Sequence, residues 1–304
     1  MRIGVFFDGT GNNASNTATG LLCGAQHPIA LTDLDASCQP YMADPNSSYG
    51  NDVTNVHKLW SLYHESRVPE GDDEQKQAFL KVYIDGIGTT AGERDSLIGL
   101  GFGRGETGVV ERVWGAFGRV RARINDMIGA NPDIEITHLT FDTFGFSRGA
   151  AVARHFANEV AQGRQGPLGD TLTSHGKAFS RCFSDRDIRM GFIGLFDTVE
   201  SVAGLDNLGN VRSRVVPGLR IYLPREGFPS VVHLVARDEY RLLSRRGRPL
   251  LAELAELCWP TRQLFAQELS PLTLPSAQPF PLHTPPRFIG SSPPKRPAVA
   301  PWPG

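Results

Sequence analysis

The chain has 304 residues and a formal net charge of −1, and 40% of its residues are hydrophobic while 21% are charged. This composition is typical of a globular protein with a sizeable core, and the length suits one large α/β domain or a domain with a tail. A net charge so close to zero provides no strong field for nucleic acid, so no nucleic-acid partner is expected.

The spacing of the cysteines and the length of the apolar runs exclude further classes of protein. Cys23, Cys38, Cys182 and Cys258 have the spacing of neither a disulfide framework nor a metal site, so we expect no disulfide framework and no metal. The first apolar run, residues 3–7, is shorter than a signal-peptide h-region, and no run approaches the roughly 18 residues of a membrane span. We therefore expect a protein made in the cytoplasm, with any export by a route that needs no cleaved leader.

The chain opens with an apolar stretch, residues 2–7, which predicts a buried strand and runs into the polar, glycine-rich sequence 8–13. Open α/β sheets bind ligands at the carboxyl ends of their strands, so this loop is a candidate site element. The backbone N–H groups of Gly9 and Thr10 are candidates for half of an oxyanion hole. A tight turn with Asn12 and Asn13 in left-handed geometry explains the same sequence equally well.

The middle of the chain alternates strand and helix patterns. Residues 14–48 are polar and lack periodicity, which predicts a long loop or insertion. Apolar residues at helical spacing predict helices over 51–65, capped by Asp52, and over 109–128. Further buried strands are predicted at 81–84, 134–144 and 191–196, and this alternation predicts an α/β fold with a mostly parallel sheet and helices on both faces.

A glycine-rich segment between these elements has two interpretations. Gly103, Gly105 and Gly108 match the Gly-x-Gly-x-x-Gly pattern, which in a dinucleotide-binding fold follows directly on a strand. Residues 95–100 make a poor strand, so a loop or lid over a cleft is the favoured interpretation. Nucleotide binding remains a further alternative, and measurable nucleotide affinity would be required to support it.

The strongest local signal is Gly145-Phe146-Ser147-Arg148-Gly149, which lies between a predicted strand and a small-residue helix over 148–160. This context is typical of a nucleophile elbow, in which a sharp turn exposes the serine and the glycines allow strand and helix to approach. The helix start directs N–H groups and its positive dipole end toward a developing oxyanion. The alternative is a tight turn in which Ser147 caps the helix.

Two later positions complete a candidate triad in the order Ser, Asp, His. Asp197 directly follows the strand predicted at 191–196, where an α/β-hydrolase keeps its acid, although a strand-end Asp also caps turns. Residues 229–243 show helical spacing and predict a helix that contains His233. Beyond residue 245 a helical segment is expected at 244–270, and half of the 22 prolines lie in 271–304, where no packed core is expected.

Five motifs occur in the order typical of one family. They are FFDGTGNN at 6–13, GIGT at 86–89, GFSRGA at 145–150, LFDTV at 195–199, and the segment 233–241 that contains His233, Asp238-Glu239 and Arg241. The chain resembles the family once catalogued as an uncharacterised α/β-hydrolase domain, which includes phospholipase effectors of bacterial type VI secretion. The resemblance covers about residues 1–243, which we expect to form the catalytic domain.

The resemblance implies a serine esterase that acts on the acyl esters of phospholipids and needs no cofactor. Ser147 would attack the carbonyl, Asp197 would orient a histidine, and Arg148 would supply an oxyanion N–H together with Gly9 or Thr10. A phospholipid or membrane surface is the implied substrate. A secretion apparatus and an immunity protein are the implied partners of a secreted antibacterial effector.

One departure from the family concerns the base. Family members usually continue to a second histidine motif, Gly-x-His-Ser-Asp followed by Gly-Gly, which supplies the triad base; here arginines at 245, 246 and 248 and the proline-rich tail stand instead. His233 is the candidate carried over, although a position inside a helix also fits a structural role, while His283 lies in sequence unlike any site. Two hypotheses follow: a truncated or frame-shifted copy, testable by translating the other frames after the Arg241 codon, and a catalytically impaired remnant or binding module.

Overall fold

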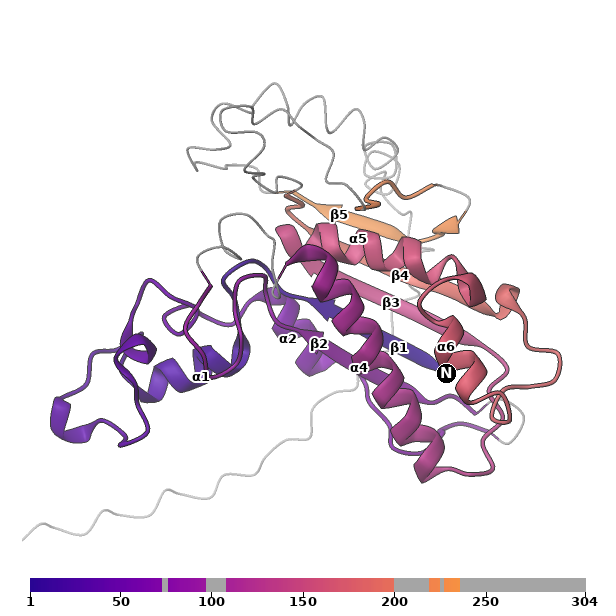
Figure 1. Cartoon of the computed structure of the whole chain (residues 1–304), viewed down its shortest axis with the longest axis horizontal. Helices are drawn as coiled ribbons and strands as arrows, with labels where there is room; N and C mark the ends of the chain where they lie inside the picture. The colour runs from indigo at the N-terminus through magenta and orange to yellow at the C-terminus, as the bar shows by residue number, and fades with distance from the viewer. Residues whose placement is uncertain (73–75, 97–107, 200–218, 225–226, 236–304) are drawn as a thin grey trace, which may run out of the picture. The chain divides into compact units, whose positions relative to one another are not determined.

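The computed structural model describes residues 1–72, 76–96, 108–199, 219–224 and 227–235 (Figure 1). All of them belong to one compact unit, Met1–Thr261. Gly103 and Gly105 of the glycine-rich segment, the helical segment expected at 244–270, the proline-rich stretch 271–304 and His283 lie outside the described residues.

The described strands form one parallel sheet in the order β2-β1-β3-β4-β5. Their bounds are Arg2–Phe7 for β1, Phe79–Ile84 for β2, Leu139–Phe146 for β3, Ile188–Phe196 for β4 and Val231–Leu234 for β5. Phe7 pairs with Ile84 and Gly145, and Phe146 pairs with Phe196, so the carboxyl ends of these strands meet at one edge of the sheet. The strands predicted at 2–7, 81–84 and 191–196 are therefore confirmed, and the one predicted at 134–144 is confirmed from residue 139 onward. The strand ends are brought together as an open α/β sheet requires.

Helices cover both faces of the sheet. On one face, α5 (Arg148–Val160) packs Phe156 against Phe7, with ring centroids 5.4 Å apart, and α4 (Val109–Ala130) stacks Phe117 on Phe156 at 4.6 Å. On the other face, Tyr63 follows α2 (Asn55–Leu62) and its ring lies 5.4 Å from that of Phe6. The predicted α/β fold with helices on both faces is confirmed. In the described part of the chain, no helix combines the length and apolar character needed to cross a membrane.

The stretch predicted as a long loop contains a helix. Asn13 caps α1 (Ala14–Leu22), because its side-chain oxygen accepts the N–H groups of Ser15 and Asn16. Similarly, Thr54 caps α2 in place of the predicted Asp52. Shorter helical elements are η1 (Leu31–Asp33), η2 (Pro40–Ala43), η3 (Gly163–Gln165), α6 (Gly169–Ser174) and η4 (Asp185–Asp187).

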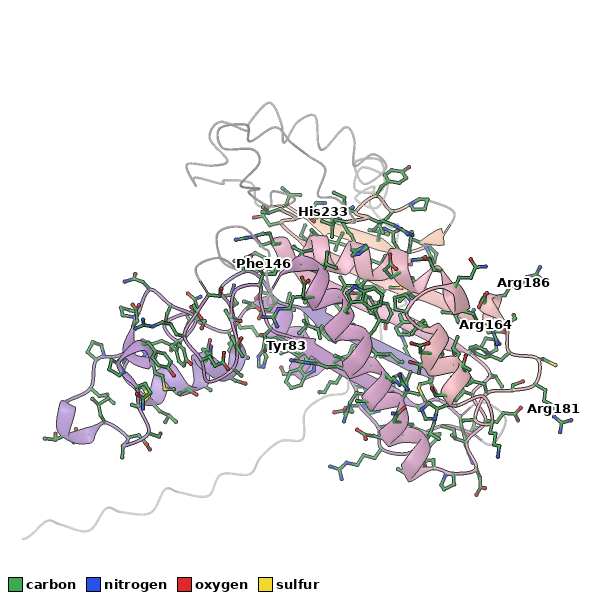
Figure 2. All side chains as sticks on the ribbon, viewed as in Figure 1. Tyr83, Phe146, Arg164, Arg181, Arg186 and His233 are labelled. Carbon is green, nitrogen blue, oxygen red and sulfur yellow. A yellow bond between two sulfur atoms is a disulfide. The ribbon has the colours of Figure 1, made fainter. Side chains whose placement is uncertain are left out.

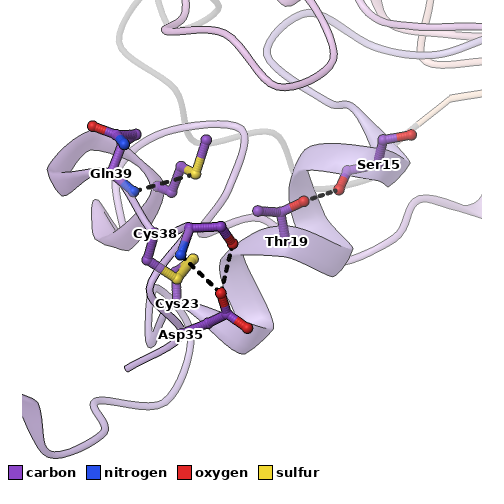
Figure 3. Close-up of a disulfide and its surroundings, with 8 residues drawn as sticks. Ser15, Thr19, Cys23, Asp35, Cys38 and Gln39 are labelled. Carbon is purple, nitrogen blue, oxygen red and sulfur yellow. Dashed lines mark hydrogen bonds between the residues drawn. A yellow bond between two sulfur atoms is a disulfide. The ribbon is translucent and has the colours of Figure 1, made fainter. Parts of the chain in front are cut away.

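A disulfide joins Cys23, at the end of α1, to Cys38, with their Cα atoms 5.6 Å apart (Figure 3). This corrects the expectation from cysteine spacing that the chain has no disulfide framework. The pairing was not readable from the sequence because it depends on the intervening segment folding back on α1. The bridge closes a short local loop and therefore ties this segment together independently of the sheet.

The segment predicted as a helix at 229–243 begins instead as a strand. β5 pairs in parallel with β4, and His233 lies in register with Leu195. Residues 231–235 are an apolar run with three valines, and such a short run does not distinguish a buried helix from a strand. Pairing with β4 decides for the strand, which suits β-branched side chains. The remainder of that predicted helix, residues 236–243, lies outside the described residues.

Candidate active site

Ser147 occupies a strained turn between β3 and α5. Its backbone has φ 56° and ψ −125°, and among the described residues only Ser147 and Asp197 combine a positive φ with a side chain other than glycine. The Ser147 N–H donates to the carbonyl of Phe196 at 2.9 Å, which joins the turn to the end of β4. A non-glycine residue in such a conformation costs on the order of 1–3 kcal/mol and persists where the surrounding structure enforces it. This is the backbone geometry expected of a nucleophile elbow.

At both glycines of the motif, neighbouring backbone atoms lie too close to leave room for a Cβ. A Cβ on Gly145 would lie 2.5 Å from the carbonyl oxygen of Gly149, and a Cβ on Gly149 would lie 2.3 Å from the carbonyl oxygen of Asp8. The first contact lets strand β3 and helix α5 pass each other. The second places the start of α5 directly against the end of β1. The glycines therefore act as the sequence pattern predicts, and they bring the Asp8 loop to the serine turn.

The Asp8 side chain organises the loop after β1. Its carboxylate is buried and accepts the N–H of Gly9 at 2.7 Å and the hydroxyl of Tyr83 at 2.6 Å. Burial raises the pKa of Asp8, and hydrogen bonds from Tyr83, Thr54 and Gly9 oppose that rise. Tyr83 lies near the end of β2, so the carboxylate connects two neighbouring strand ends. Sequence analysis did not single out Tyr83, although its place near the end of a predicted strand was a usable signal.

The backbone N–H groups of the loop after β1 differ in whether they already donate a hydrogen bond. The N–H of Gly9 is used by Asp8, and those of Gly11 and Asn12 donate to the carbonyls of Ile87 and Gly9, each at 3.0 Å. Within the described part of the chain, Thr10 uses neither its N–H nor its hydroxyl in a hydrogen bond. The left-handed residue of the turn is Gly11, at φ 72°, and neither Asn12 nor Asn13. Of the two predicted donors, Thr10 is thus the one whose N–H remains available.

Asp197 follows β4 directly and lies next to the serine turn. Its φ is 51°, its N–H donates to the carbonyl of Leu234 at 2.7 Å, and the N–H of Val199 donates to the carbonyl of Ser147 at 3.2 Å. These bonds connect the Asp197 turn to β5 on one side and to the elbow on the other. Ser147 and Asp197, which the sequence predicts to be members of one triad, therefore have adjacent backbones.

His233 meets the same turn from β5. Its Nε2 accepts the backbone N–H of Thr198 at 3.3 Å, so in the neutral ring the proton resides on Nδ1. Burial, and to a lesser degree the charge of Arg154, lower the pKa of His233 to about 4. The imidazole is consequently neutral at pH 7. Figure 2 shows His233, Phe146 and Tyr83 at the same ends of three different strands.

Arg148 is the first residue of α5 and follows the serine directly. Its guanidinium is partly buried, and this burial lowers its pKa. The structure thus gathers Ser147, Arg148, Thr10, Asp197 and His233 at the carboxyl edge of one sheet. Thr198, the partner of His233, lies in the LFDTV motif at 195–199, but nothing in the sequence indicated this contact. No group of three or more His, Cys, Asp and Glu side chains that could hold a metal occurs among the described residues.

Fold and site together define an α/β protein whose parallel sheet has a serine in a strained strand-to-helix turn at its carboxyl edge. Among solved structures, the chain is similar to a Tle1 effector bound to the VgrG spike from a type VI secretion system, with 31% identity and a TM-score of 0.53 over 79% of this chain and 45% of that one. The chain therefore spans less than half of that effector's length.

A second match is an uncharacterized protein from Pseudomonas aeruginosa, with 18% identity and a TM-score of 0.35 over 79% of this chain and 36% of that one. No protein-family model and no curated protein matches the chain. The 31% identity to the Tle1 effector supports the resemblance to type VI effectors that the motifs indicated.

Proposed function

We propose that the chain is a serine esterase that hydrolyses acyl esters of phospholipids. The observation that carries the proposal is the backbone of Ser147, a non-glycine residue held at φ 56° between a buried strand and a helix start. A capping serine has extended backbone and accepts an N–H with its side chain, whereas Ser147 has neither feature. The strain is compensated by surrounding contacts, which is the pattern of a functional residue.

In the proposed reaction, the base takes the hydroxyl proton of Ser147 while Oγ bonds to the ester carbonyl carbon and the carbonyl π electrons move to the carbonyl oxygen. The N–H groups of Arg148 and Thr10 donate to the resulting oxyanion. When the electrons return, the bond to the leaving alcohol breaks and the base returns its proton to that alcohol. Water then repeats the sequence on the acyl-serine and releases the fatty acid. No cofactor is part of this scheme.

His233 is the proposed base, and it can act only after it breaks an existing hydrogen bond. Nε2 accepts the Thr198 N–H at 3.3 Å and must release it before taking the Ser147 proton. A pKa of about 4 keeps the ring neutral and able to accept a proton at pH 7, but makes the imidazolium costly. Asp197 is proposed to offset this cost by orienting and stabilising the protonated ring.

We also propose that the chain belongs to an effector that a type VI secretion system exports. The support is its 31% identity to a Tle1 effector that is bound to a VgrG spike. A component of a secretion apparatus is therefore the proposed delivery partner, and an immunity protein is the proposed partner that protects the producing cell. The proposed target is a phospholipid membrane.

The His233 hydrogen bond also favours a second candidate function. A partly buried imidazole whose acceptor nitrogen binds a backbone N–H has the geometry of a structural residue, here holding the turn at 197–199. In that case the chain is a catalytically impaired scaffold or binding module that retains the elbow without a base. Ser147 would then keep its backbone geometry but react slowly.

A fluorophosphonate probe on the 304-residue chain distinguishes the two. Stoichiometric labelling that Ser147→Ala abolishes supports the hydrolase, and release of fatty acid from phospholipid vesicles tests the substrate. His233→Gln is the sharper second variant, because its amide oxygen can accept the Thr198 N–H but cannot act as a base. Loss of labelling in a folded His233→Gln protein supports the base role, while unchanged labelling supports the structural role. A folded wild-type chain that does not label rejects the hydrolase.

A further inference from the structure

The hydroxyl of Thr10 is buried and has no hydrogen-bond partner within the described part of the chain. Buried hydroxyl groups are nearly always paired, so an unpaired one requires an explanation. The explanation is not a loosely held loop, because the neighbouring groups are fully engaged. Asn12 Nδ2 donates to the carbonyls of Gly9 and Thr10, each at 3.2 Å.

The hydroxyl lies on the segment that contacts the serine turn. A Cβ on Gly9 would lie 2.4 Å from the Phe146 ring, and a Cβ on Gly149 would lie 2.3 Å from the Asp8 carbonyl oxygen. Residues on both sides of Ser147 therefore touch residues directly before Thr10. The loop also has a buried anchor, since the Asp8 carboxylate holds the Gly9 N–H at 2.7 Å and the Tyr83 hydroxyl at 2.6 Å.

The position of Asp8 determines which hydrogen-bond donors of this loop remain unused. By taking the N–H of Gly9, it removes one donor of the loop, and the carbonyl of Ile87 takes that of Gly11. Thr10 between them retains two donors, its N–H and its Oγ–H. A residue that keeps both donors unused at a strained serine turn is suited to bind a negatively charged oxygen, which accepts several hydrogen bonds at once.

We infer that the Thr10 side chain is itself a catalytic group, whose hydroxyl donates to the oxyanion in addition to the backbone N–H of the same residue. The inference rests on the proposed esterase function and deepens it. The base takes the Ser147 hydroxyl proton while Oγ forms a bond to the carbonyl carbon and the carbonyl π electrons move to oxygen. That oxygen then accepts three hydrogen bonds: from Arg148 N–H, Thr10 N–H and Thr10 Oγ–H. The three donors are released when the electrons return and the ester bond breaks.

Threonine suits this role better than a flexible donor. Its β-branched side chain restricts χ1, so the hydroxyl is held in place before substrate binds. A donor that is already oriented stabilises charge without reorganising during the reaction. The hydroxyl is expected to act on the transition state rather than on the bound ester, and its loss should lower kcat with little change in KM.

The test uses Thr10→Val, which removes the hydroxyl, keeps the backbone N–H and preserves the branched shape. A fluorophosphonate is the probe, because Ser147 Oγ bonds to phosphorus, fluoride leaves, the base takes the serine proton, and the phosphoryl oxygen occupies the oxyanion position. We expect Thr10→Val to label about 100-fold more slowly than the wild type. Thr10→Ser, which restores the hydroxyl on an unbranched side chain, is expected to label faster than Thr10→Val and more slowly than the wild type.

Thr173→Val on α6 is the matched control, since it loses a hydroxyl that donates to the Gly169 carbonyl at 2.8 Å. It should label at the wild-type rate. Thermal melting verifies that each variant is folded, and Thr10→Ala replaces Thr10→Val if the latter does not fold. Wild-type labelling by Thr10→Val, or equal slowing in Thr10→Ser, overturns the inference and leaves the proposed function intact. Absence of labelling in folded wild type overturns both.

Discussion

Gly149→Ala tests whether the start of α5 must lie against the end of β1. The added Cβ would be 2.3 Å from the Asp8 carbonyl oxygen and 2.6 Å from that of Phe7. Both are backbone atoms of the sheet and its loop, so neither can rotate away. Inserting a methyl into such a packed site costs typically 1–3 kcal/mol. The gain in helix propensity from glycine to alanine is about 1 kcal/mol.

Because contacts this short place the cost at the upper end of that range, the clash outweighs the propensity gain, and we expect a net loss of about 2 kcal/mol. For a chain of this size, that corresponds to a melting temperature about 4–8 °C lower. Urea unfolding should show a lower midpoint with an unchanged m value. The variant should also label slowly with fluorophosphonate, since the methyl displaces the Asp8 loop from the serine turn.

Gly118→Ala is the matched control on α4, where an added Cβ would meet no atom within 4 Å. It gains helix propensity without a clash, and should be as stable as the wild type or up to about 1 kcal/mol more stable. If Gly149→Ala has wild-type stability and labels at the wild-type rate, the argument from close approach is wrong. Equal destabilisation of both variants would also contradict it.

Three further predictions follow from the same contacts. Replacing Cys23 and Cys38 by serine should lower the free energy of unfolding by about 3 kcal/mol, because the bridge closes a loop of sequence separation 15. Tyr83→Phe leaves a buried oxygen of Asp8 without its hydroxyl donor and should cost about 1–3 kcal/mol in urea unfolding. The folded chain resists protonation of His233 down to about pH 4, while the unfolded chain takes that proton near pH 6.5. Wild type should therefore lose up to about 3 kcal/mol of stability between pH 6.5 and 4 relative to His233→Gln.

Each of these three predictions has a distinct contradicting result. An unchanged melting temperature after reduction by dithiothreitol would mean that the bridge does not stabilise the fold. Wild-type stability of Tyr83→Phe would mean that Asp8 does not depend on that hydroxyl. Parallel stability curves of wild type and His233→Gln from pH 7 to pH 4 would mean that the pKa of His233 is not lowered by folding.

Local sequence determined the elements that carry the serine. The pattern from 134 to 160 predicted a strand, a glycine-flanked serine and a small-residue helix, and the structure has β3, Ser147 and α5 at these positions. Glycines 145 and 149 have the close contacts that the motif implies. Such features are readable because the backbone conformation, the helix start and the required absence of Cβ all depend on residues that are near in sequence.

Only the tertiary structure decided the features that join distant segments. Pairing with β4 made His233 part of a strand rather than a helix, and folding back of the segment after α1 brought Cys23 to Cys38. The sequence left open whether Gly9 or Thr10 supplies the N–H, and the hydrogen bond from the Gly9 N–H to Asp8 favours Thr10. Periodicity and motif spacing record local geometry, whereas strand pairing, disulfide geometry and the allocation of hydrogen-bond donors depend on which remote groups meet.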